Sequence, residues 1–200
     1  MDAGDWDDRY RDTELVWSAG PNLFVEQQSG DLPAGRSLDL AAGEGRNAIW
    51  LAERGWDSTA VDYSSVAIDK ARQIAERRGV TITTEVADLG GYLPTQGAYD
   101  LVIIAYLQLV EAELTPILRR AAAALASGGR FVLVSHDLSN LDQGYGGPQE
   151  ASVLTTPNQV AEAIGGALTI DLAEVVERHV QTDGGQKTAL DTLVVARRSA

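Results

Sequence analysis

Short apolar runs of strand length alternate along this chain with stretches whose apolar residues recur at helical spacing. Between the runs, apolar residues at intervals of three and four indicate helices, and most of these stretches stop at a glycine. Strands that alternate with helices predict a parallel sheet with helices on both faces. The chain is therefore expected to form a doubly wound α/β fold. The five strand-like runs are residues 37–41, 58–61, 80–86, 101–105 and 131–134.

A different pattern closes the chain. Thr156 and Pro157 carry the signal for a helix start, and two β-like runs follow at about residues 169–180 and 189–196. A turn at residues 183–185 separates the two runs, and a short turn makes its flanking strands antiparallel neighbours. We therefore predict a mostly parallel, seven-stranded sheet that ends in a C-terminal antiparallel hairpin.

Composition narrows the possible partners and the compartment. The 200 residues include 16 Lys and Arg against 29 Asp and Glu, and the resulting net charge of −13 repels nucleic acid. The chain has no cysteine, and no His, Asp or Glu cluster has metal-ligand spacing, so no metal site is expected. The longest near-apolar run, residues 101–110, is too short to span a membrane. The acidic start lacks a signal-peptide core, so we expect a cytoplasmic protein with no membrane partner.

The densest signal lies where the first predicted strand turns into a helix. Residues 38–48 read LDLAAGEGRNA, a strand followed by a glycine turn and a helix. At such a turn a ligand can approach bare backbone and free helical N–H groups. Asp62, at the end of the second strand, is placed to bind a ribose diol. This glycine pattern alone also fits a nicotinamide dinucleotide fingerprint.

Three features favour S-adenosylmethionine over a dinucleotide. Asp39 lies inside the first strand, where a carboxylate suits a cationic amino group better than a pyrophosphate. Asp88 follows the third strand, where it can accept from an adenine amino group. The length also leaves no space for a separate dehydrogenase substrate domain.

With these motifs, the chain resembles the class I S-adenosylmethionine-dependent methyltransferases from about Trp6 to Arg198. Residues 39–45 match the family's first motif, with Ala41 where a first glycine is common. Residues 43–47, GEGRN, resemble the signature of the tellurite-resistance and thiol methyltransferase-like branch. The resemblance implies S-adenosyl-L-methionine as cofactor. The residues it implies for binding are Asp39, Ala41, Gly43, Gly45, Arg46, Asn47, Asp62, Tyr63, Asp88 and Leu89.

Two side chains at the carboxyl edge of the predicted sheet are candidate catalytic residues. Tyr106 follows the fourth strand and His136 follows the fifth, and open α/β folds bind ligands at this edge. His136 has the pKa range of a base near neutral pH, although a hydrogen-bonded strand-end histidine is an alternative. The expected reaction is in-line methyl transfer to a small-molecule acceptor: a thiol, a chalcogen oxyanion or another small metabolite. A non-catalytic S-adenosylmethionine sensor and a small NAD(P)-dependent oxidoreductase remain alternatives.

Two segments are expected to cover the site. Residues 1–30 are predicted to form an N-terminal helical or lid segment, ahead of a Rossmann-like cofactor-binding domain over residues 31–200. The aromatic faces of Trp6, Tyr10 and Trp17 attract a sulfonium, although a helix packed on the core would explain them equally well.

The second segment, residues 137–155, is longer than an ordinary connection. Its glycines at 144, 146 and 147 give it hinge-like freedom, which predicts a lid over the acceptor. A passive connector is the alternative.

Overall fold

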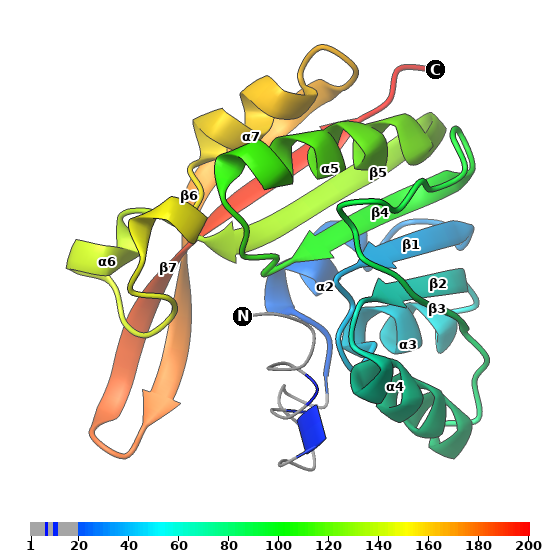
Figure 1. Ribbon diagram of the computed structural model, residues 1–200, viewed down its shortest axis with the longest axis horizontal. Helices are drawn as coiled ribbons and strands as arrows, with labels where there is room; N and C mark the ends of the chain where they lie inside the picture. The colour runs from blue at the N-terminus through cyan, green and yellow to red at the C-terminus, as the bar shows by residue number, and fades with distance from the viewer. Residues whose placement is uncertain (1–6, 8–9, 12–19) are drawn as a thin grey trace.

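Seven strands form one sheet in the order β3-β2-β1-β4-β5-β7-β6 (Figure 1). The computed structural model describes Asp7, Tyr10, Arg11 and residues 20–200. Strands β3, β2, β1, β4 and β5 are parallel, and β7 lies antiparallel between β5 and β6. The predicted sheet with its C-terminal antiparallel hairpin is confirmed. The strands are β1 (Arg36–Leu40), β2 (Asp57–Asp62), β3 (Thr83–Val86), β4 (Tyr99–Ala105), β5 (Leu125–His136), β6 (Thr169–Thr182) and β7 (Gly185–Arg197).

Helices cover both faces of this sheet. Helices α5 and α7 pack with one apolar cluster, and α2 and α3 pack with another on the opposite face (Figure 1). Helix α4 lies beside β2 and β3. The helices are α2 (Leu23–Ser29), α3 (Arg46–Ala52), α4 (Ser65–Arg77), α5 (Glu111–Ala124), α6 (Asn140–Gln143) and α7 (Pro157–Ile164), with a 3₁₀ turn η1 (Ala151–Val153). Among the described residues, none of the helices could span a membrane.

The central strand β4 shows why its sequence is apolar at successive positions. Val102 and Ile104 pack in the cluster of α5, whereas Leu101 and Ile103 pack in the cluster of α2 and α3. All four side chains are buried because the strand has helices on both faces. The two main apolar clusters of the core therefore lie on opposite faces of the sheet.

The C-terminal hairpin is longer than its sequence pattern predicts. Strand β5 pairs with β7 only from Arg130 opposite Arg197 to His136 opposite Asp191. The remainder of β7 pairs only with β6, so the two strands continue as a ribbon past the carboxyl end of β5 (Figure 1). This ribbon brings residues from the end of the chain beside the region where a ligand would bind.

The stretch between β5 and α7 is ordered by its own polar contacts. It contains α6 and η1, and a parallel bridge joins Asp137 to Thr155 at its two ends. The buried amide of Asn140 donates to the carbonyl of Gly146 at 2.8 Å and accepts from the N–H of Leu190 at 2.8 Å. The stretch is therefore anchored to β7 rather than free of the core.

Candidate functional site

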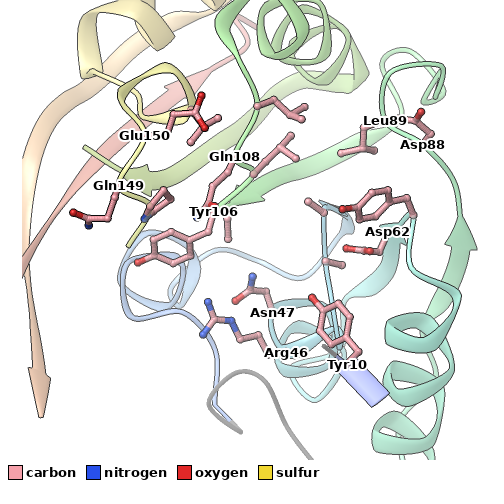
Figure 2. A pocket seen from close by; sticks show the side chains of 18 residues that line it. Tyr10, Arg46, Asn47, Asp62, Asp88, Leu89, Tyr106, Gln108, Gln149 and Glu150 are labelled. Atoms are coloured by element: carbon pink, nitrogen blue, oxygen red, sulfur yellow. The ribbon is translucent and has the colours of Figure 1, made fainter. Parts of the chain in front are cut away.

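A cavity of about 430 Å³ opens at the carboxyl edge of the sheet (Figure 2). It lies where β1 and β4 are neighbours, the point at which the strand order reverses and open α/β folds bind ligands. Its walls come from the N-terminal segment, the ends of four strands or the turns after them, and the stretch after β5. The lining residues are Tyr10, Ala41, Ala42, Arg46, Asn47, Asp62, Tyr63, Asp88, Leu89, Ala105, Tyr106, Leu107, Gln108, Leu109, Pro148, Gln149, Glu150 and Val153.

Seven of the ten predicted cofactor residues line this cavity, and Asp39, Gly43 and Gly45 do not. Asp39 is 1% exposed in β1, and neither of its carboxylate oxygens has a hydrogen-bond partner among the described residues. Burial raises the pKa of Asp39 to about 7, although the Arg46 guanidinium and nearby amides act to lower it. Because burial disfavours its charged form, this carboxyl would be further stabilised as a carboxylate by an approaching cation, such as the amino group of S-adenosylmethionine.

The turn after β1 has a left-handed backbone at three positions. Ala41 has φ +58°, Gly43 has φ +54° and Gly45 has φ +74°. For the alanine, this conformation costs on the order of 1 kcal/mol, and such strain tends to persist at ligand sites. At Gly45 a Cβ would lie 3.0 Å from the Cβ of Ala71, so this glycine permits the close contact of α3 with α4. Gly43 and Gly45 therefore shape the turn from behind the cavity wall.

Asp62 connects the end of β2 to that turn. Its Oδ2 accepts from the N–H of Gly43 at 2.8 Å, and its Oδ1 accepts from the N–H of Ser64 at 2.9 Å. A carboxylate offers about four lone-pair positions, so the side chain retains acceptor capacity beyond these two bonds. Burial raises the pKa of Asp62. Tyr63, the next residue, also lines the cavity.

Asp88 and Leu89, predicted to bind the adenine, both line the cavity. Asp88 is exposed, and its carboxylate accepts from the N–H of Gly90 at 2.8 Å. Leu89 is buried and presents an apolar wall next to it. Arg120 of α5 donates to the carbonyls of Leu89 and Gly90 and so holds this segment in place.

Arg46 and Asn47 open helix α3 and face the cavity from below in Figure 2. Asn47 is buried, and its Oδ1 accepts from the N–H of Asn22 at 2.9 Å. The side chain of Asn22 in turn caps helix α2. Asn47 therefore ties α2 to the turn after β1 (residues 41–45), the predicted cofactor turn. This structural role of Asn47 was not predicted from the sequence. Burial lowers the pKa of Arg46.

The two candidate catalytic residues meet at the ends of β4 and β5. The rings of Tyr106 and His136 have centroids 4.8 Å apart, and Tyr106 lines the cavity while His136 does not. The Tyr106 hydroxyl donates to Oδ2 of Asp191 at 2.7 Å. Burial, followed by the Asp191 charge, raises the pKa of Tyr106, so its hydroxyl stays protonated. Nδ1 of His136 lies 3.2 Å from Oδ1 of Asp191.

Asp191 and its partner Arg178 were not among the site residues predicted from the sequence. Asp191 is fully buried on β7, and Nε of Arg178 on β6 donates to its Oδ2 at 2.7 Å. Burial acts to raise the pKa of Asp191, but the His136 and Arg178 side chains together hold it below its usual range. The sequence feature that could have indicated Asp191 is that it is the single carboxylate in the otherwise mostly apolar run at residues 189–196.

Part of the N-terminal segment that is predicted to cover the site lies within the described residues. Tyr10 is buried and lines the cavity, and its carbonyl accepts from Nζ of Lys70. The same Nζ lies 3.3 Å from Oε1 of Glu44 in the cofactor turn. Trp6 and Trp17 lie outside the described residues.

Comparisons with known proteins identify the family that part of this chain matches. A family model for the methyltransferase domain matches residues 38–129, which include the turn after β1, Asp62 and Asp88. The 2-heptyl-1-hydroxyquinolin-4(1H)-one methyltransferase of Mycobacteroides abscessus is 27% identical over 180 residues, which cover 85% of this chain and 75% of that protein. The tRNA 5-carboxymethoxyuridine methyltransferase of Escherichia coli is 34% identical over 133 residues, which cover 64% of this chain and 49% of that protein. This chain thus spans about half the length of the tRNA enzyme.

Solved structures share the fold over the whole chain. The N-methyltransferase NodS from Bradyrhizobium japonicum, solved with S-adenosyl-L-homocysteine, has a TM-score of 0.73 at 16% identity, with full coverage of both chains. TehB from Haemophilus influenzae has a TM-score of 0.75 at 17% identity and covers 100% of this chain and 68% of its own. Residues 38–129 match the methyltransferase-domain family, and the whole chain shares the fold of methyltransferases of solved structure.

Proposed function

We propose that this enzyme transfers the methyl group to a small molecule held between the end of β4 and the stretch after β5. The observation that carries the proposal is the composition of the cavity wall beyond the cofactor residues. Residues 106–109 form one side, and Pro148, Gln149, Glu150 and Val153 form the other. This second half is lined by apolar and uncharged polar groups with a single carboxylate, which suits a small, partly apolar acceptor.

The residues of the first half fit S-adenosylmethionine. Asp39 supplies a buried carboxyl that a bound cation would ionise, Asp62 supplies further acceptor capacity for a ribose, and Asp88 with Leu89 suits an adenine. When bound, this cofactor supplies a methyl group made electrophilic by its sulfonium. The chain's contribution is then to hold the acceptor in line with the methyl–sulfur bond and to exclude water, which can contribute up to about 7–11 kcal/mol.

A neutral hydroxyl or amine acceptor also needs a group that takes its proton, and we assign this role to His136. Oδ1 of Asp191 lies 3.2 Å from Nδ1 of the imidazole, where it would orient a ring that carries its proton on Nδ1. Gly147 lies over the same ring, where an added Cβ would approach it to 3.1 Å. The stretch after β5 must therefore shift before His136 can reach an acceptor. Tyr106 is protonated and bonded to Asp191, so its proposed role is to shape the wall. A thiolate or other soft anion needs no base.

Charge supports a small acceptor over a nucleic acid. The net charge of −13 opposes the approach of a phosphate backbone. The Mycobacteroides relative, whose name specifies a quinolone substrate, matches a larger share of this chain than the tRNA enzyme does. Within the small-molecule class we retain thiols, chalcogen oxyanions and hydroxylated aromatic metabolites.

A turnover panel tests the proposal. Purified protein is incubated with labelled S-adenosylmethionine and, separately, with alkyl and aryl thiols, selenite, phenols, 2-heptyl-1-hydroxyquinolin-4(1H)-one and total tRNA. We expect methyl transfer to at least one small molecule and none to tRNA. Transfer to tRNA alone would overturn the proposed acceptor class. Tight binding of S-adenosylhomocysteine with no transfer to any acceptor would favour the non-catalytic sensor.

A further inference from the structure

Tyr106 has a backbone conformation that non-glycine residues do not favour. Its φ is +60°, in the left-handed region that non-glycine residues seldom occupy. It is the first residue after β4, and its N–H donates to the carbonyl of Val134 at 2.8 Å. Leu107, Gln108 and Leu109 follow it along the cavity wall. A strained residue at the start of this wall persists only if surrounding contacts hold it there.

The strongest side-chain contact comes from the far end of the chain. Asp191 is fully buried on β7, and its Oδ2 accepts from both the Tyr106 hydroxyl and Nε of Arg178, each at 2.7 Å. The Arg178 guanidinium also lies 5.5 Å from the centre of the Tyr106 ring. Asp191 faces His136 directly across the β5–β7 pair. The buried carboxylate of Asp191 thus contacts Tyr106 and Arg178 and faces His136.

We infer that Asp191 is a positioning residue for methyl transfer, because it holds Tyr106 in the left-handed conformation and so sets the wall formed by residues 106–109. This inference rests on the proposed function, which assigns that wall to the acceptor. Asp191 does not line the cavity, so it acts through Tyr106 rather than by touching the acceptor.

The charge of Asp191 is essential to this role. A carboxylate can accept from the tyrosine hydroxyl and the guanidinium together, and such charge-assisted bonds are about twice as strong as neutral ones. Asparagine at this position has nearly the same volume but would leave the partly buried Arg178 without the carboxylate. The hydroxyl of Tyr106 would then have a weaker acceptor, and the strained backbone would relax toward an ordinary conformation.

The backbone NMR signature of Tyr106 tests the inference without any acceptor. In the wild-type protein, the HN–Hα coupling and the Cα and Cβ shifts should report positive φ. In Asp191→Asn we expect these values to move toward right-handed or extended geometry, and the Tyr106 amide to exchange faster with solvent. Asp171→Asn is the matched control, because it removes a carboxylate from a more exposed ion pair with Arg197 on the same hairpin. If Asp191→Asn does not fold, Tyr106→Phe removes the same bond from the other side.

Cofactor binding and turnover complete the test. The affinity for S-adenosylhomocysteine should change by no more than about twofold in Asp191→Asn, because Asp191 does not line the cavity and the predicted ribose and adenine residues, Asp62 and Asp88, lie at the ends of other strands. With the acceptor identified by the panel, kcat should fall roughly 10- to 100-fold, as expected for a reacting group displaced by about 1 Å. An unchanged Tyr106 signature in Asp191→Asn would overturn the inference. A wild-type protein that does not bind S-adenosylhomocysteine would instead overturn the proposed function.

Discussion

At the scale of single residues, Asp39 makes cofactor binding sensitive to pH. Its pKa of about 7 means that a sizeable fraction of the ligand-free protein carries a proton on this carboxyl near neutral pH. A cation bound nearby favours the ionised form, so S-adenosylmethionine should displace that proton. At about pH 6, we expect calorimetry in buffers of different ionisation enthalpy to detect release of up to about one proton per cofactor bound. The Asp39→Asn variant should release almost none, and equal release from both proteins would contradict the assignment.

The same carboxyl affects the stability of the ligand-free protein. Its pKa is 3.8 as a free side chain and about 7 in the fold, so between these values the folded state binds more protons than the unfolded state. The contribution of Asp39 to the free energy of unfolding must therefore decrease as the pH rises through this window. Urea denaturation at several pH values should show a smaller decrease in Asp39→Asn than in the wild type. A parallel pH dependence in the two proteins would argue against the raised pKa.

Asp62 has two tasks, and its removal should affect both. Asp62→Ala removes the acceptor for a ribose diol and also the acceptor for the Gly43 and Ser64 amides. We expect the affinity for S-adenosylhomocysteine to fall by more than about tenfold in a variant that remains folded. Asp57→Ala, at the exposed far end of the same strand, should leave this affinity unchanged. Unaltered binding by Asp62→Ala would remove this residue from the site.

At the scale of elements, the stretch between β5 and α7 combines a fixed part with a part that faces the cavity. The Asn140 side chain ties its first half to β7, whereas residues 148–150 line the cavity. Gly146 and Gly147 join these parts with φ values of +72° and +75°, which other residues rarely adopt. The arrangement agrees with a lid that pivots at the glycines.

Replacing residues 144–148 with a short Ser/Gly linker tests this function. The linker keeps the backbone permissive but removes Pro148 and changes the path of the segment that bonds Asn140 and covers His136. We expect nearly unchanged affinity for S-adenosylhomocysteine, together with a raised KM for the acceptor or a lower kcat. If the variant methylates its acceptor at the wild-type rate, the stretch is only a connector. The acceptor site would then be built from the N-terminal segment and Tyr106.

At the scale of the whole molecule, ligand binding at the switch point should stabilise the fold against heat. The cavity residues come from both halves of the sheet, so a molecule bound there contacts elements on either side of β1 and β4. A ligand at 100 times its Kd adds about 2.7 kcal/mol to the free energy of unfolding. For a domain of this size, that corresponds to a rise in Tm of roughly 5–10 °C. S-adenosylmethionine and S-adenosylhomocysteine should give this rise, and NADH and NADPH should give none.

Much of the fold and the cofactor half of the site could be predicted from the sequence alone. The alternation of apolar runs and helical stretches is a local property, because period and turn chemistry act over only a few residues. The turn at residues 41–45 and the strand-end carboxylates Asp62 and Asp88 are local signals of the same kind. Parallel strands carry such groups to one edge, so a correct strand order was enough to bring them together.

The half of the site proposed to hold the acceptor could be seen only in the tertiary structure. Asp191 and Tyr106 are 85 positions apart, and they meet because the register of β7 on β5 places Asp191 opposite His136. The length of the β6–β7 ribbon likewise brings Arg178 to the same carboxylate. Register and ribbon length depend on the packing of strands that are distant in sequence, and a slip of one residue would turn every side chain to the opposite face. The sequence by itself therefore determined the cofactor turn and the order of elements, whereas long-range strand pairing determined which side chains stand behind the acceptor wall.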